Sequence, residues 1–226
     1  MSEWWTYTLS DFLLFSPRTY YRLIELYNLA IWPAQIAGVA IGVTIIALLV
    51  STRSGRDRII AGLLAICWLW IAWAFHYQRY AQINWAAPSF AVAFAIQALL
   101  LVVLGSLAGR IVLQPSGGGR RIAISLVAIT ILVYPLLAPF AGRAWTTAET
   151  FGVAADPTAI ATVAALALVH GRIRWLLLIV PLLWCAVAAA TLWAMDAQLE
   201  AVVVAGLAVV ALAARGMRNG GAGAMR

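Results

Sequence analysis

Long apolar runs alternate along the chain with short polar segments, and most of these polar segments contain arginine. A transmembrane helix needs about 20 mainly apolar residues, because every backbone polar group in hydrocarbon must be paired within the segment. The runs predict an all-α transmembrane bundle with about seven spans, at 29–50, 59–77, 87–108, 122–141, 157–170, 175–194 and 199–214. The fifth run would rise only about 21 Å as a helix, a length more typical of a re-entrant or buried segment.

Arginine placement predicts the orientation, since short cytoplasmic loops collect basic residues. All 15 basic residues are arginines. With seven spans and the N-terminus outside, only Arg18, Arg22, Arg79 and Arg143 lie outside. The inside set is Arg53, Arg56, Arg58, Arg110, Arg120, Arg121, Arg172, Arg174, Arg215, Arg218 and Arg226. If the fifth run did not cross, the C-terminal arginines would move outside, so the count favours seven crossings, N-out and C-in.

The chain divides into three predicted parts: a periplasmic interfacial helical segment at 1–28, the transmembrane domain at 29–214 and a flexible cytoplasmic tail at 215–226. Ser16 followed by Pro17 is a typical helix start, with a capping hydroxyl and then proline in the first turn. Tyr20, Ile24 and Tyr27 follow at helical spacing beside charged residues. This pattern is typical of a helix that lies in the membrane interface.

Composition supports a membrane protein, since 65% of the residues are hydrophobic and 10% charged, where soluble domains carry about a quarter charged. The lipid bilayer is therefore the first predicted partner. The net charge of +7 does not predict nucleic-acid binding, because the arginines lie between apolar runs and not along one face. The absence of lysine excludes a Schiff base to retinal or pyridoxal phosphate.

Neither a metal site, a cofactor nor an enzymatic activity is predicted. The two histidines, His76 and His170, fall on opposite sides of the predicted membrane and cannot ligate one haem. The sequence has no zinc-ligand spacing around Cys67 or Cys185, no phosphate loop and no nucleophile elbow. No predicted span carries a charged residue in its interior, which disfavours a carboxylate-coupled pump.

The densest polar and aromatic segment runs from 73 to 85, at the outer end of the second predicted span. In a continuous α-helix, with about 100° between successive residues, five of these side chains would lie within a sector of roughly 100° on one face. That sector holds Trp73, His76, Tyr77, Tyr80 and Asn84. Arg79 would point elsewhere and reach the headgroups, and Trp85 follows at the start of the next run. These residues predict an outer vestibule that binds a ligand, although an interfacial belt of Trp and Tyr is the simpler explanation of the aromatic side chains.

Three further candidates lie at matching depth: Gln35, Tyr134 and Asp156. Asp156 stands before Pro157 at the start of the fifth run, where an aspartate is commonly a helix N-cap. Capping is therefore the alternative to a ligand-binding role for Asp156.

Five segments carry a family resemblance: 9–21, 31–35, 74–80, 83–88 and 181–185. They resemble an uncharacterised bacterial family of small multi-pass membrane proteins, a domain of unknown function. The resemblance implies a bacterial inner-membrane location, and it assigns no catalytic role to any residue of this chain. The leading hypothesis is a non-enzymatic membrane protein that recognises a small-molecule ligand or a partner at the outer vestibule. The alternatives are a permease for a neutral or weakly polar solute and a structural subunit bound to another membrane protein.

Overall fold

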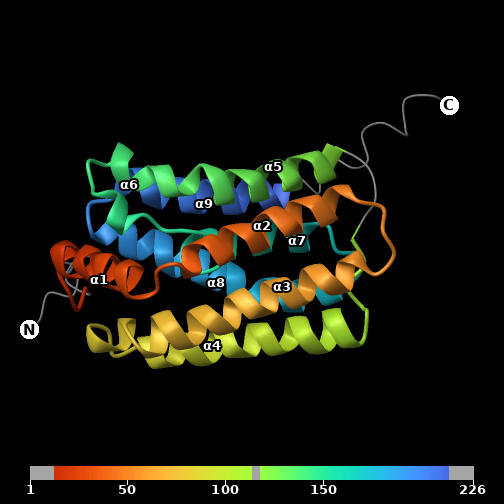
Figure 1. Cartoon of the computed structure of the whole chain (residues 1–226), viewed down its shortest axis with the longest axis horizontal. Helices are drawn as coiled ribbons and strands as arrows, with labels where there is room; N and C mark the ends of the chain where they lie inside the picture. Colours follow the sequence, from red (N-terminus) through yellow and green to blue (C-terminus); the bar gives the residue numbers. More distant parts are fainter. Residues whose placement is uncertain (1–12, 114–117, 214–226) are drawn as a thin grey trace, which may run out of the picture.

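The chain folds into a bundle of roughly parallel and antiparallel helices (Figure 1). The computed structural model describes residues 13–113 and 118–213, so residues 1–12 and the predicted tail at 215–226 lie outside the described part. Its α-helices are α1 Pro17–Ala30, α2 Ala34–Val50, α3 Arg56–Trp70, α4 Ala87–Leu100, α5 Gly118–Leu132, α6 Leu137–Phe140, α7 Ala155–Ala167, α8 Ile173–Ala194 and α9 Gln198–Ala213. Two π-helices, η3 Ile71–Tyr77 and η5 Leu101–Leu107, prolong α3 and α4, and short 3₁₀ turns are η4 Tyr80–Gln82, η6 Tyr134–Leu136 and η7 Trp145–Thr147. The described residues contain no strand.

Three helices are long and apolar enough to cross a membrane: Arg56–Gln82, Ala87–Leu107 and Ile173–Ala194. Two bent pairs raise the number to as many as five, α1 with α2 at 87° and α5 with α6 at 42°. The sequence predicts seven spans, and the difference lies in α7 and α9, which have 13 and 16 residues. The outer faces of the long helices carry exposed apolar side chains, among them Ile66, Leu99 and Leu183, which suits contact with lipid.

Helix α1 confirms the predicted helix start but also breaks the first predicted span. The Ser16 hydroxyl accepts the backbone N–H of Thr19 at 3.2 Å, and Pro17 stands in the first turn. The helix ends at Ala30, and Pro33, which has no N–H to continue a helix, separates it from α2. Residues 29–50 are therefore not one continuous helix.

Helix α7 lies in the middle of the bundle, packed between α3, α5, α8 and α9 (Figure 1). Every one of its 13 residues is buried. The Trp68 indole N–H on α3 donates to the Thr162 hydroxyl at 2.9 Å, which joins the two helices. At 1.5 Å per residue α7 is about 20 Å long, shorter than a hydrocarbon core of about 30 Å. The fifth apolar run therefore forms a short helix that is enclosed by protein on all sides.

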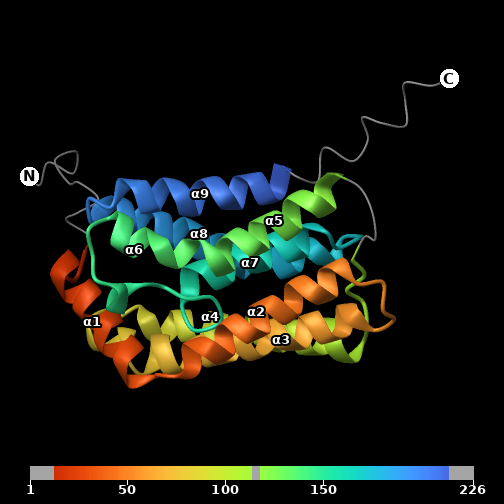
Figure 2. The ribbon, with the colours of Figure 1, turned by 45° about the horizontal axis from the view of Figure 1, so that its top comes forward.

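The segment from 141 to 154 leads back into the bundle before α7 begins (Figure 2). Phe151 is fully buried, and a Cβ atom placed on Gly38 of α2 would lie 2.4 Å from the Phe151 carbonyl oxygen. The Tyr27 hydroxyl donates to the Val153 carbonyl at 2.8 Å. Irregular backbone at this depth is tolerated because protein surrounds it and supplies its hydrogen bonds.

The two ends of the bundle differ in charge. The loops after α2, η5 and α7 meet at one end, here called the arginine end (Figure 1), which carries Arg53, Arg56, Arg58, Arg110, Arg120, Arg121, Arg172 and Arg174. The acidic residue among the described residues at that end is Asp57, whose carboxylate lies 3.2 Å from the Arg56 guanidinium. The opposite end, here called the α1 end, carries α1, α6, the turn at 78–86 and the start of α9. Within the described residues, the arginines that the sequence analysis assigns to the cytoplasmic side therefore lie together at one end of the bundle.

Candidate functional site

The predicted aromatic face of residues 73–84 is divided in the structure, because the helix does not keep its α-helical turn. Residues 71–77 form a π-helix, in which backbone hydrogen bonds span five residues and the side chains change direction. Trp73 and Tyr77 point outward, 60% and 54% exposed, with their rings stacked at 5.1 Å. His76 points inward and is fully buried. The prediction that these three side chains share one face is therefore wrong.

His76 lies in a cage of aromatic rings. Its ring centroid lies 4.4 Å from Phe94, 4.8 Å from Trp184 and 5.2 Å from Phe75. Tyr80 also packs against it, at 6.0 Å. Neither imidazole nitrogen has a hydrogen-bond partner among the described residues. His76 thus belongs to the core beneath the α1 end and does not line an open vestibule.

Tyr80, Asn84 and Trp85, three of the predicted ligand-binding residues, line a surface hollow of about 390 Å³. The hollow, here called the Trp85 hollow, is completed by Leu13, Leu14, Phe15, Ala86 and Thr191. The Asn84 side-chain oxygen accepts the backbone N–H of Ala86 at 2.9 Å, which fixes the turn, while Trp85 is 79% exposed. Arg79 is half-buried and is not part of this lining.

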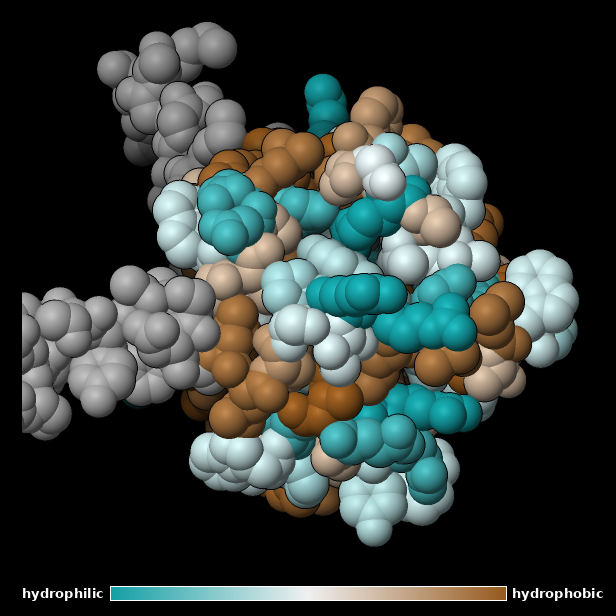
Figure 3. Space-filling model, turned by 90° about the vertical axis from the view of Figure 1, so that its left-hand side faces the viewer, coloured by the Kyte–Doolittle hydropathy of each residue, from teal (hydrophilic) through white to brown (hydrophobic). Residues whose placement is uncertain are grey.

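Gln35 lines a second hollow of about 380 Å³ at the break between α1 and α2. Its side-chain amide donates to the Asn28 carbonyl at 2.8 Å. The exposed rings of Trp32 and Trp145 also contribute to the lining. Figure 3 shows the α1 end, where hydrophilic side chains gather among apolar ones.

Asp156 has a different role from the predicted helix cap. Helix α7 begins one residue earlier, its N-cap is Ala154, and no side chain caps it. The Asp156 carboxylate is buried and accepts the Trp184 indole N–H at 2.9 Å. It stands in the first turn, where the helix dipole favours a negative charge. The capping prediction is wrong, and Asp156 and Tyr134 instead form part of a buried polar site.

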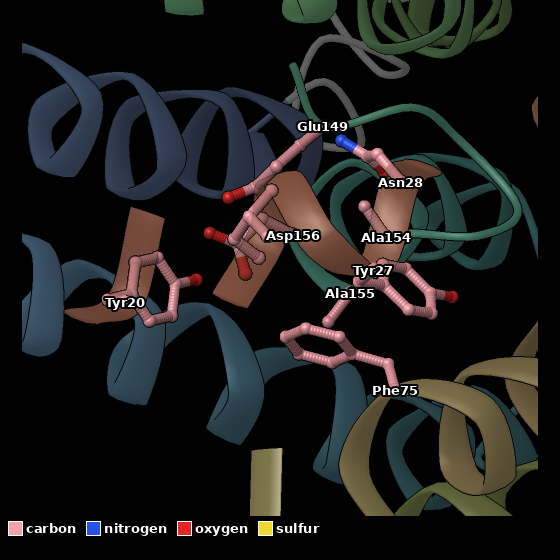
Figure 4. Close-up of a pocket in the computed structure, with 9 residues that line it drawn as sticks. Tyr20, Tyr27, Asn28, Phe75, Glu149, Ala154, Ala155 and Asp156 are labelled. Atoms are coloured by element: carbon pink, nitrogen blue, oxygen red, sulfur yellow. The ribbon is translucent and has the colours of Figure 1, made fainter. Parts of the chain in front are cut away.

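Glu149 lies beside Asp156, on the segment that returns into the bundle. In Figure 4 the two carboxyl groups face each other, and the Tyr20 hydroxyl points toward Asp156. Glu149 lines two small cavities, one shared with Asp156 and Tyr20 and one shared with Arg143 and Glu200. Each leaves about 10 Å³ for the centre of a water molecule, room for about one water.

An ion pair closes the second cavity. The Arg143 guanidinium donates to the Glu200 carboxylate at 2.8 Å, and the two side chains are only 19% and 8% exposed. Arg143 also lies over the Tyr21 ring at 4.0 Å. Burial raises the pKa of Glu149, the negative charge of Asp156 raises it further, and Arg143 opposes the shift. Glu149, Asp156, Arg143 and Glu200 are called the acidic cluster below.

Comparison of the sequence with protein-family models matches the chain to a family without an assigned activity. The chain belongs to a family of unknown function (DUF6064), whose model matches residues 18–222. This DUF6064 match runs from Arg18 in α1 through α9. It includes the acidic cluster and the hollow at Gln35, and all of the Trp85 hollow except Leu13, Leu14 and Phe15. Membership agrees with the resemblance to an uncharacterised family. Searches of curated proteins and of solved structures found no match.

Three members of the acidic cluster, Glu149, Arg143 and Glu200, were not predicted as site residues. They lie in or beside segments that the hydropathy pattern assigns to outer loops. The available signal was the spacing of Glu149 and Asp156, two acidic residues on either side of the apolar stretch 151–155. Within the described ranges no three His, Cys, Asp or Glu residues form a group that could hold a metal ion.

Proposed function

We propose that this DUF6064 member is a non-enzymatic, multi-pass protein of the bacterial inner membrane that binds a small ligand at its α1 end. The α1 end would face the periplasm and the arginine end the cytoplasm, N-out and C-in. The helices long enough to span and their exposed apolar faces support membrane insertion. The collection of arginines at one end supports this orientation.

The Trp85 hollow is the observation that carries the proposal of ligand binding. Ligand sites are concave, mostly apolar and supplied with a few polar groups. The Trp85 hollow has this character, with aromatic rings, the Asn84 amide and the Thr191 hydroxyl, and without a charged side chain in its lining. A neutral or weakly polar molecule with an apolar body suits such a lining, since an ion would lose hydration without gaining a countercharge.

We expect Trp85→Ala to abolish retention of a small molecule that co-purifies with the wild-type protein. Trp85 is 79% exposed, so its removal takes away contact surface in the hollow at little cost to folding. The measurement is native mass spectrometry of protein extracted from its own membrane. The matched control is Phe140→Ala, since Phe140 is 78% exposed at the same end and lines neither hollow. Equal retention in both variants would refute ligand binding at this hollow.

A permease for a neutral or weakly polar solute is the second candidate, and α7 is the observation that favours it. In many transporters a half-length helix begins within the bundle, and its N-terminus contributes to the substrate site. Helix α7 has this form, enclosed and about 20 Å long, with Asp156 in its first turn. Uptake of the retained molecule into proteoliposomes would support a permease, whereas saturable binding without uptake would support a receptor or accessory subunit.

A further inference from the structure

The acidic cluster has an unbalanced charge. Glu149, Asp156 and Glu200 are three carboxyl groups, and Arg143 is the one cation among the described residues that line the two cavities. Arg143 is already engaged in the pair with Glu200 at 2.8 Å. If all four groups were ionised, a site with room for about one water in each cavity would hold a net charge of −2. Buried charges require a partner or become neutral, so the cluster needs an additional positive species.

The position of Tyr20 indicates that the additional positive species lies in the cavity of Glu149 and Asp156. Its side chain is 7% exposed, and its hydroxyl has no hydrogen-bond partner among the described residues although it lines the cavity of Glu149 and Asp156. In Figure 4 the hydroxyl is directed toward the Asp156 carboxylate. A phenol can donate to a carboxylate or to a water. Three oxygen-bearing side chains therefore converge on one small cavity.

Other elements around the pair supply no second countercharge. The titratable groups around it are Tyr20 and Tyr21 from α1, His76 from η3, Tyr80 from η4, Tyr134 from η6, Cys185 from α8 and Glu200 from α9. Arg79 acts on Tyr27, which lines the same cavity, but Arg79 itself is not part of that lining. The missing positive species must therefore come from solution.

We propose that Glu149 and Asp156 form a proton-binding site that holds one exchangeable proton at neutral pH. The proton comes from water entering the small cavity, binds a Glu149 carboxyl oxygen and is shared with the facing Asp156 carboxylate. Asp156 keeps its negative charge because the Trp184 indole N–H donates to it at 2.9 Å. Tyr20 closes the site on the side of α1. This proposal is independent of ligand binding at the Trp85 hollow.

Infrared spectroscopy of the full chain in lipid vesicles tests the site. At pH 7 the wild-type protein should show the carbonyl absorption of one protonated carboxyl group, which shifts in D₂O and disappears at alkaline pH. Glu149→Gln should lose this absorption completely. The matched control is Glu25→Gln, because Glu25 is paired with Arg22 on the exposed side of α1 and should leave the absorption unchanged.

Two results would overturn the proposal. One is a wild-type protein without a protonated carboxyl group at pH 7; if its thermal stability also rose with sodium concentration, the missing species would be a metal cation and not a proton. The other is an absorption that survives in both Glu149→Gln and Asp156→Asn, which would place the proton elsewhere. The wild-type measurement decides the first question even if a variant fails to fold.

Discussion

Replacing Gly38 by alanine is expected to lower the free energy of unfolding by about 2 kcal/mol or more. Adding atoms to a well-packed core typically costs about 1–3 kcal/mol. The new Cβ atom would lie 2.4 Å from the Phe151 carbonyl oxygen, and a backbone atom cannot rotate away. Alanine gains up to about 1 kcal/mol over glycine in a helix interior, which is too small to offset the clash. The segment before α7 would have to move, and with it Glu149 and Asp156.

Unfolding in detergent, followed by circular dichroism against temperature or added denaturing detergent, measures this effect. Gly206→Ala is the matched control, since Gly206 is also inside a helix, α9, and a Cβ atom there meets nothing within 4 Å. The control should be neutral or slightly more stable than wild type. If Gly38→Ala behaved like Gly206→Ala, the close approach of α2 to the returning segment would be wrong.

Arg143→Met is expected to destabilise the protein by about 3–5 kcal/mol, the usual cost of leaving one partner of a buried ion pair uncompensated. Arg143 is the countercharge for Glu200, and the pair is largely buried. Protonation removes the unpaired charge, so the loss should be largest at neutral pH and smaller in acid. The same unfolding measurement, repeated at two pH values, checks both statements.

The exposed pair Arg22–Glu25 provides the control for this prediction. Its distance of 2.7 Å nearly equals the 2.8 Å of Arg143–Glu200, but the Arg22 side chain is 60% exposed where Arg143 is 19% exposed. Arg22→Met should therefore cost only about 0–1 kcal/mol. Adding Glu200→Gln to Arg143→Met should recover most of the stability. A double variant as unstable as Arg143→Met alone would show that Arg143 acts through packing and not through charge.

Local signals in the sequence were sufficient for part of the fold and of the site. Ser16 and Pro17 identify the start of α1, because capping depends only on neighbouring residues. The polar turn after the second apolar run identifies Tyr80, Asn84 and Trp85 as lining residues, since polar and aromatic side chains are denser there than in the other segments of the chain.

Other features depend on contacts that periodicity does not contain. The π-helix at 71–77 shifts the register within a continuous apolar run, where no alternation of polar residues records the change, and so His76 turns into the core. Glu149 meets Asp156 because the segment between α6 and α7 returns into the bundle. That return rests on Gly38 and on one hydrogen bond from Tyr27, and both residues are distant in sequence from the segment.

Cysteine labelling in intact cells tests the membrane orientation on which the proposed function rests. Cys67 and Cys185 are buried, so a membrane-impermeant maleimide should leave the wild-type protein unlabelled. Trp85→Cys at the α1 end should react from outside, and Arg172→Cys at the arginine end should react only after the membrane is opened. Labelling of Arg172→Cys in intact cells, with Trp85→Cys protected until the membrane is opened, would contradict a periplasmic ligand site.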